Sequence, residues 1–143
     1  MATVTALLNS GTRTTINARQ FSWLADEPEP AGGTDQGPTP YEILLGALAA
    51  CITTTLRLYS DYKGIPLKGV DVSLEFDRVH AEDCLECDNP NGGMIDRIKT
   101  KITLRGTFTD AQRTRLAQVA ERCPVHKTLV RGIQIFDSVS FES

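Results

Sequence analysis

The chain has 143 residues, a length that suits one domain of ordinary size. Its 41% hydrophobic and 23% charged residues are usual for a soluble globular protein. A net charge of -3 at pH 7 shows no basic excess, which argues against nucleic acid as the main partner. We therefore expect a single domain over residues 1–143.

The beginning of the chain and its cysteines bear on the cellular compartment. The first residues, Met-Ala-Thr-Val-Thr, have neither the basic region nor the apolar run of a signal peptide. Four cysteines without such a signal are typical of a reducing cytoplasm. Thiols there are more often catalytic, redox-active or metal-binding than structural. We therefore expect a cytoplasmic protein.

Three short strands are predicted near the N-terminus, over residues 2–8, 12–17 and 20–24. The sequence Asn-Ser-Gly between the first two is a turn signal, so an antiparallel meander is expected. Residues 26–38 are too rich in Pro and Gly for regular structure. Long loops of this kind are more often functional or mobile than idle.

Residues 40–62 are predicted as the long central helix of the fold. Thr39 suits the N-cap, Pro40 suits the first helical position, and Glu42 completes a capping box. Gly64 ends the helix. Apolar side chains lie on all of its sides, so we expect a core helix that is buried nearly all round, and not a membrane span.

Two strands are predicted to follow the helix. Residues 70–79 alternate between apolar and polar side chains, which is typical of a half-buried strand. Residues 80–94 form a turn-rich excursion, and residues 95–107 return as the second strand.

A helix, a helical turn and a strand are predicted at the end of the chain. Thr109 or Asp110 caps a helix that extends to Arg122. Residues 126–131 add a short turn of helix, and residues 133–141 are predicted as a final strand. The expected order is β-β-β-α-β-β-α-β, an α+β domain.

Two cysteine motifs lie far apart in the sequence. The first is Thr-Pro-Tyr-Glu-Ile-Leu-Leu-Gly-Ala-Leu-Ala-Ala-Cys, which ends at Cys51, and the second is Glu-Arg-Cys-Pro-Val-His, which contains Cys123. In this order they resemble the osmotically inducible protein C (OsmC)-like family, which includes the organic hydroperoxide resistance proteins. The resemblance covers residues 4–141.

The resemblance implies an α+β fold with antiparallel sheets around a long central helix, in an intertwined homodimer. It also implies a thiol-dependent peroxidase that requires no cofactor. Cys51 would reduce an organic hydroperoxide, Cys123 would resolve the sulfenic acid as a disulfide, and a dithiol reductant would reopen it. The chemistry is consistent, because a thiolate is the nucleophile and a sulfenic acid must be trapped by a nearby thiol. The alternative is two buried structural cysteines.

Groups that could activate Cys51 are less clear from the sequence. Peroxidase members of the family have an acid ten positions before the helix cysteine, where this chain has Tyr41. The nearest acid is Glu42, for which the capping box is the competing role. The family also places an arginine over the thiolate. Arg13 and Arg19 are the candidates, and the alternative for each is a solvent-facing strand residue.

A second cluster of potential ligands contains His80, Cys84 and Cys87. A C-x2-C pair is half of a zinc site, and His80 could be a third ligand. A fourth ligand would have to come from Asp83, Asp88 or His126. The pair could instead be free thiols on a flexible turn, or a regulatory or auxiliary disulfide. The alternative function is therefore a non-enzymatic zinc- or ligand-binding protein on the same fold.

His126 follows Cys123 by three residues. If a helix ends at Cys123-Pro124, the imidazole could lie near the thiol and lower its pKa. The alternative is a surface histidine in a turn.

Overall fold

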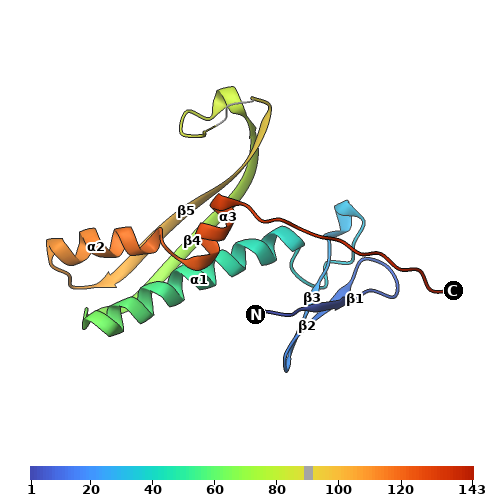
Figure 1. Ribbon diagram of the computed structural model, residues 1–143, viewed down its shortest axis with the longest axis horizontal. Helices are drawn as coiled ribbons and strands as arrows, with labels where there is room; N and C mark the ends of the chain where they lie inside the picture. The colour runs from blue at the N-terminus through green and yellow to red at the C-terminus, as the bar shows by residue number, and fades with distance from the viewer. Residues whose placement is uncertain (89–91) are drawn as a thin grey trace. The chain divides into compact units, whose positions relative to one another are not determined.

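The computed structural model of the chain describes residues 1–88 and 92–143 (Figure 1). The chain divides into two compact units, residues 1–47 with 74–100, and residues 48–73 with 101–143. Since the chain passes between the units more than once, neither is a contiguous stretch of sequence. One domain over residues 1–143 stays a prediction.

The three predicted N-terminal strands form an antiparallel sheet in the order β1-β2-β3. They are β1 (Thr5–Leu7), β2 (Thr14–Ala18) and β3 (Phe21–Ala25). Ile16 lies opposite Ala6 on one side and Trp23 on the other. The turn between β1 and β2 contains a glycine, Gly11, with a φ of 62°, which few other residues adopt readily. The predicted meander is confirmed.

The Pro- and Gly-rich loop after β3 is tied down by one buried carboxylate. Asp26 is only 2% exposed, and both of its oxygens accept hydrogen bonds. The donors are the hydroxyls of Thr12 and Thr34, each at 2.5 Å, and the backbone N–H groups of Glu27 and Gln36. These bonds hold the pKa of Asp26 well below its usual range, and the bond from Thr12 lowers it most. The loop contains one short 3-10 turn, Glu29–Ala31.

The central helix α1 (Pro40–Lys63) begins and ends where the sequence predicts. The N–H of Glu42 donates to the hydroxyl of Thr39, and the N–H of Thr39 donates to the Glu42 carboxylate at 2.9 Å. This is the predicted capping box, which satisfies donors that a helix start otherwise leaves free. Gly64, with a φ of 67°, ends the helix.

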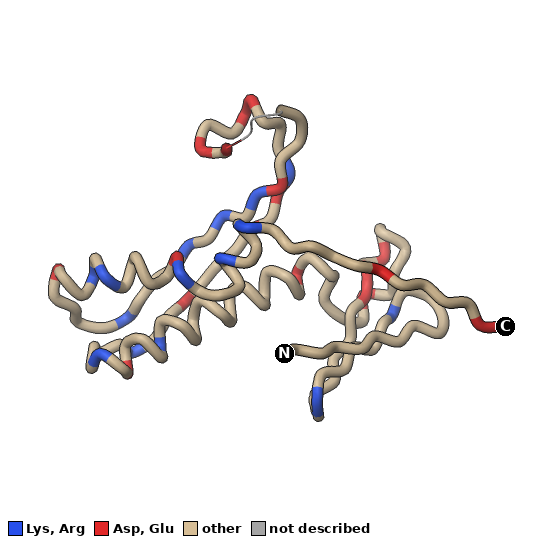
Figure 2. Tube along the Cα trace, in the orientation of Figure 1, with Lys and Arg blue, Asp and Glu red and all other residues tan. Residues whose placement is uncertain are grey.

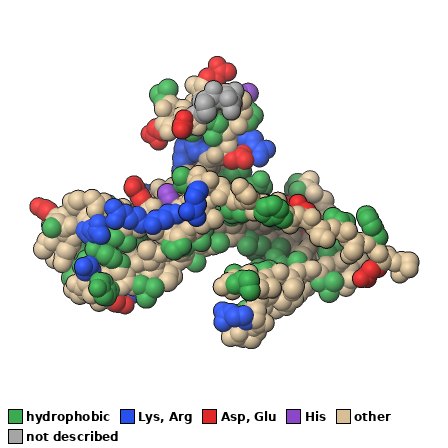
Figure 3. All heavy atoms as spheres, viewed as in Figure 1, with side chains coloured by type: hydrophobic (Ala, Val, Ile, Leu, Met, Phe, Trp, Pro, Cys, Tyr) green, Lys and Arg blue, Asp and Glu red, His purple; other side chains and the backbone are tan. Residues whose placement is uncertain are grey.

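The prediction that α1 is buried nearly all round is wrong for the single chain. Among the described residues of α1, the buried ones form one stripe, Leu48, Ile52, Leu56 and Ser60. Leu58 is 64% exposed and Tyr62 is 82% exposed. An apolar side chain is buried only where another element packs against it, and the rest of the helix lacks that cover. Figure 3 shows hydrophobic side chains on the surface over α1.

By length and composition, α1 is long enough and apolar enough to cross a membrane. A core helix of a soluble protein meets the same criterion, so this finding carries little weight. The helix also carries Glu42, Arg57 and Asp61.

Strands β4 (Leu67–His80) and β5 (Met94–Gly106) form a two-stranded sheet. Half-buried and exposed residues alternate along most of β4, as predicted. Three ion pairs cross between the strands: Arg78–Asp96, Arg97–Asp77 and Arg105–Asp71. Figure 2 shows these basic and acidic positions along the two strands. The loop between the strands begins with a 3-10 turn, Ala81–Asp83.

Two helices follow β5. Helix α2 (Asp110–Ala120) starts with a capping box between Thr109 and Gln112, and buries Leu116, Val119 and Ala120. It ends two residues before the predicted Arg122. Helix α3 (Pro124–Arg131) then extends the predicted turn of helix toward the N-terminus, because Pro124 occupies its first position.

The predicted final strand is wrong for the single chain. Residues 133–141, all of them described, contain no strand. Ile135 is 75% exposed and Phe136 is 88% exposed. An alternating segment becomes a strand only when a neighbouring strand pairs with its backbone groups, and within the described residues none does. The observed order is therefore β-β-β-α-β-β-α-α, still an α+β chain with antiparallel sheets and a long central helix.

Candidate functional site

Cys51 lies near the middle of α1 and is half-buried. The helix positions it one turn before Thr55, whose hydroxyl is 4.0 Å from the sulfur. Since Cys51 neighbours the buried stripe at Ile52, its side chain stands at the edge of the covered face. A thiol in this position is sheltered and still reachable by a small molecule.

Cys123 is fully buried and forms the N-cap of α3. Its sulfur accepts a hydrogen bond from the backbone N–H of His126 at 3.3 Å. The local sequence explains this geometry, because Pro124 is suited to the first helical position and the residue before it adopts an extended backbone. The result is a thiol aimed at the unpaired N–H groups of a helix start.

The two thiols meet at the N-terminus of α3. The backbone N–H of Val125 donates to the Cys51 sulfur at 3.4 Å, next to the N–H of His126, which donates to the Cys123 sulfur at 3.3 Å. Both are free thiols in this structure. A helix N-terminus carries a partial positive charge and free N–H donors, both of which stabilise a thiolate. The arrangement can therefore hold one thiolate and one thiol side by side.

The surroundings of Cys123 shift the pKa of its thiol. Burial raises the pKa of the Cys123 thiol, and the neighbouring Cys51 sulfur raises it further. The N–H groups of His126 and Val125 oppose this, but the net direction is upward. The Cys123 thiol therefore keeps its proton at neutral pH. The lowering contribution of His126 comes from its backbone N–H, and an effect of its imidazole on Cys123 stays a prediction.

The other predicted catalytic residues are described within the N-terminal unit. Arg13 is exposed and donates a long hydrogen bond, 3.4 Å, to Gln36. Arg19 is also exposed, and its guanidinium lies over the ring of Phe21. Glu42 is exposed and engaged in the capping box, where the bond from Thr39 lowers its pKa. The capping role of Glu42 is thus observed, whereas Arg13 and Arg19 face solvent just outside the ends of β2. The action of all three on Cys51 stays a prediction.

The residues predicted as metal ligands are His80, Cys84 and Cys87, and in this structure two of them are not free thiols. Cys84 and Cys87 are joined in a disulfide, with Cα atoms 5.4 Å apart. Zinc binds thiolates, and a disulfide sulfur is not one. Within residues 1–88 and 92–143, no group of three or more His, Cys, Asp or Glu side chains is arranged to hold a metal ion. The auxiliary disulfide is the alternative that the structure displays, and zinc binding by the reduced pair stays a prediction.

Two contributors were missed by the sequence analysis. The N–H of Val125 reaches Cys51, and Arg97 reaches the sulfur of Cys84 at 3.8 Å. The Cys-Pro pair could have indicated the first, because Pro marks a helix start and hence free N–H groups. The sequence has no comparable signal for the second, since it depends on the pairing of β4 with β5.

The chain is similar to known proteins in sequence pattern and in fold. A family model described as OsmC-like protein matches residues 33–136. An OsmC-like protein from Mycoplasma pneumoniae has a similar structure, with a TM-score of 0.71 and 23% identity over 91% of this chain and 87% of that chain. No curated protein sequence matches the chain.

Two further similar structures are organic hydroperoxide resistance proteins. That from Legionella pneumophila has a TM-score of 0.64 and 17% identity, over 92% of this chain and 90% of that chain. OhrB from Bacillus subtilis has a TM-score of 0.53 and 22% identity, over 92% of this chain and 91% of that chain. At these identities the likeness concerns the fold.

Proposed function

Because this chain belongs to the OsmC-like protein family, we propose that it is a thiol-dependent peroxidase that reduces organic hydroperoxides through Cys51 and Cys123. The observation that carries the proposal is that these two free thiols accept hydrogen bonds from adjacent backbone N–H groups, those of Val125 and His126, at the start of α3. The similar fold of two organic hydroperoxide resistance proteins supports the choice of substrate class.

In the first step, the Cys51 thiolate attacks the terminal oxygen of the hydroperoxide. The O–O bond breaks and a sulfenic acid forms on Cys51. The leaving alkoxide takes up a proton and departs as the alcohol. The N–H of Val125 supports the attacking thiolate by hydrogen bonding to its sulfur. Cys51 is the better attacking group because it is half-exposed, whereas Cys123 is buried and its pKa is raised.

In the second step, Cys123 attacks the Cys51 sulfenic acid. A disulfide forms, and water leaves with the proton that Cys123 gives up. An external dithiol then reduces the disulfide by two thiol–disulfide exchanges and is itself oxidised to a disulfide. Contact between the thiols in the reduced chain favours fast trapping, because little movement is needed before the bond can form.

Arg13 and Glu42 complete the proposed site as groups that orient or activate Cys51. Glu42 would have to exchange its capping bond with Thr39 for this role. A glutamate side chain is ionised at neutral pH, as a hydrogen-bond acceptor for a protonated partner requires. A cytoplasmic location stays a prediction.

We also propose that the protein is a homodimer. The exposed apolar side chains of α1 and of residues 133–141 support this, because a second copy would cover them and could supply the strand partner that the last segment lacks. Figure 3 shows hydrophobic side chains along that segment as well. Light scattering at micromolar concentration should give twice the 15.6 kDa mass of one chain. The mass of a single chain would contradict the proposal.

The peroxidase proposal is tested by following consumption of cumene hydroperoxide with dithiothreitol as reductant. Cys51→Ser should lower the rate by about 100-fold or more, because it removes the attacking thiolate. Circular dichroism of the variant controls for folding. A Cys51→Ser protein that folds and still consumes hydroperoxide at the wild-type rate would exclude this function.

A further inference from the structure

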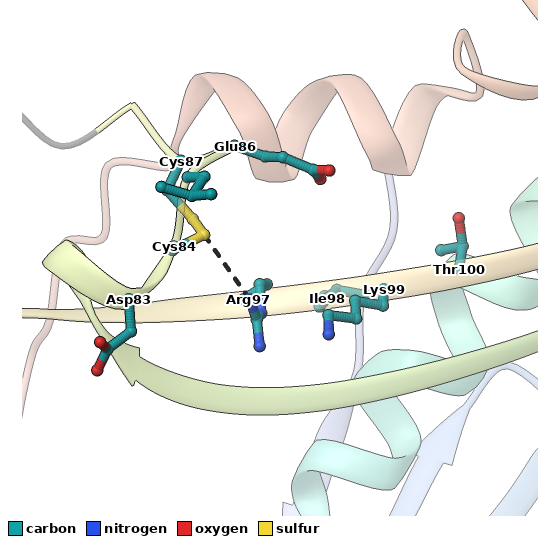
Figure 4. Close-up of a pocket in the computed structure, with 9 residues that line it drawn as sticks. Asp83, Cys84, Glu86, Cys87, Arg97, Ile98, Lys99 and Thr100 are labelled. Atoms are coloured by element: carbon teal, nitrogen blue, oxygen red, sulfur yellow. Dashed lines mark hydrogen bonds between the residues drawn. A yellow bond between two sulfur atoms is a disulfide. The ribbon is translucent and has the colours of Figure 1, made fainter.

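The disulfide between Cys84 and Cys87 lies on the loop that joins β4 to β5 (Figure 4). Backbone hydrogen bonds from Cys84 to Ala81 and from Cys87 to Cys84 fold this loop into successive tight turns. A third bond, from the N–H of Ala81 to the carbonyl of Gly93, closes the base of the loop at 2.7 Å. Hydrogen-bonded turns over residues 81–87 therefore hold the disulfide, and the peroxidase proposal makes no use of it.

The two sulfurs differ in access. Cys84 is buried, with 6% of its surface exposed, whereas Cys87 is only half-buried. Both line a hollow of about 760 Å³ between the loop and β5, whose floor includes Arg97 and Lys99. Figure 4 shows the disulfide above β5 on one side of this hollow. A thiol that enters it meets Cys87 as the more exposed of the two residues.

The position of Arg97 favours a negative charge on the sulfur of Cys84. Its guanidinium lies 3.8 Å from the Cys84 sulfur, drawn as a dashed line in Figure 4. The same guanidinium makes two hydrogen bonds to Asp77, at 2.8 and 2.6 Å, which fix its position. Asp77 raises the pKa of Arg97, so the guanidinium stays charged. A cation next to a sulfur stabilises the thiolate form and makes it a better leaving group.

We propose that Cys84 and Cys87 form a second redox site, which exchanges thiols and disulfides with an external dithiol. One thiolate of the dithiol attacks the Cys87 sulfur, a mixed disulfide forms there, and Cys84 leaves as a thiolate beside Arg97. The second thiol of the dithiol, after losing its proton, attacks its own sulfur in the mixed disulfide and releases Cys87. The chain gains two electrons and two protons, and the dithiol becomes a disulfide.

This assignment does not rest on the peroxidase proposal, because it uses none of the residues of that site. It predicts an electron-accepting pair in which Cys87 is attacked and Arg97 is a positioning residue for the Cys84 thiolate. The loop also carries Glu82, Asp83, Glu86 and Asp88, the acidic cluster visible at the hairpin loop in Figure 2. Among the residues that line the hollow, Arg97 and Lys99 are the cations, and Arg97 is the one within 3.8 Å of the Cys84 sulfur.

The test compares Arg97→Gln with a matched control on the same strands, Arg78→Gln. Arg78 is paired with Asp96 much as Arg97 is paired with Asp77, but it has no sulfur contact among those described. Each full-length protein is oxidised, treated with dithiothreitol at pH 7, quenched with an alkylating agent and digested. Mass spectrometry then follows reduction of the Cys84–Cys87 peptide. Arg97→Gln should slow this reduction about tenfold, and Arg78→Gln should leave it within about twofold of wild type.

A second measurement locates the attacked sulfur without any variant. Brief treatment of the oxidised protein with a monothiol, followed by acid quenching, should place the mixed disulfide on Cys87. An adduct mainly on Cys84, equal reduction rates in the two arginine variants, or a pair that dithiothreitol reduces only after unfolding would each overturn the proposal. If Arg97→Gln does not fold, the position of the adduct in the wild-type protein decides the matter.

Discussion

Cys51 and Cys123 come from two helices that are distant in the sequence, whereas Cys84 and Cys87 lie three residues apart on one loop. The first pair is reduced and is supported by backbone N–H groups at the start of α3. The second pair is oxidised and is accompanied by a guanidinium. The difference shows that a chain can stabilise sulfur charge with main-chain dipoles in one place and with a side-chain cation in another.

The two supports also differ in how they respond to substitution. An N–H donor persists through almost any side-chain change, so the Cys51 site is best probed through its sulfurs. A guanidinium is removed by one substitution, so the loop pair is best probed through Arg97. Substitution of the cysteines and measurement of their ionisation therefore test the first pair and its independence from the second.

Cys123→Ser should separate attack from resolution at the first pair. The variant should consume about one equivalent of organic hydroperoxide per chain and then stop, because nothing resolves the Cys51 sulfenic acid. Peptide mass spectrometry should find Cys51 as sulfenic or higher acid after a limiting dose, with no disulfide to Cys84 or Cys87. Sustained turnover at the wild-type rate would remove Cys123 from the mechanism.

Alkylation against pH should reveal the different character of Cys123. An ordinary cysteine ionises near pH 8.5, at about the midpoint of its alkylation profile. Because the folded pKa of Cys123 is raised, its thiolate fraction at any given pH is lower, and its profile should lie at higher pH. Cys51→Ser removes one of the causes of that shift and should move the profile back toward lower pH. A profile unchanged by Cys51→Ser, read from the Cys123 peptide, would contradict the contact between the thiols.

Replacing both Cys84 and Cys87 by Ser should have the smallest effect on peroxide chemistry. Turnover of cumene hydroperoxide with dithiothreitol should stay within about twofold of wild type, because the loop pair lies outside the proposed peroxidase site. Loss of turnover in a folded double variant would mean that the two pairs act in one pathway. In that case the two cysteine pairs would not be independent redox sites.

Local sequence rules predicted much of the fold. The capping box at Thr39 and Glu42 placed the start of α1, and Gly64 placed its end. The alternation of β4 and the meander of β1 to β3 followed the same kind of rule. These features could be predicted because each depends on residues within a few positions of one another.

Burial, strand pairing and the state of a cysteine pair could not be predicted from the sequence, because each depends on what packs against the segment. The composition of α1 and the alternation of residues 133–141 predict that both are covered by other elements. Within residues 1–88 and 92–143, however, only one stripe of the helix is buried and no strand pairs with the last segment. In the same way, C-x2-C spacing fits both a zinc ligand pair and a disulfide, and the structure closes the disulfide.

By itself, the sequence indicated the five observed strands, the long helix α1, the two cysteine motifs and the family to which they belong. Only the tertiary structure decided that Cys51 and Cys123 touch, that the N–H of Val125 serves one of them, and that Arg97 faces Cys84. The physical reason is range. A cap or an alternating strand is fixed by neighbours along the chain, whereas contact between distant sulfurs depends on how whole elements pack.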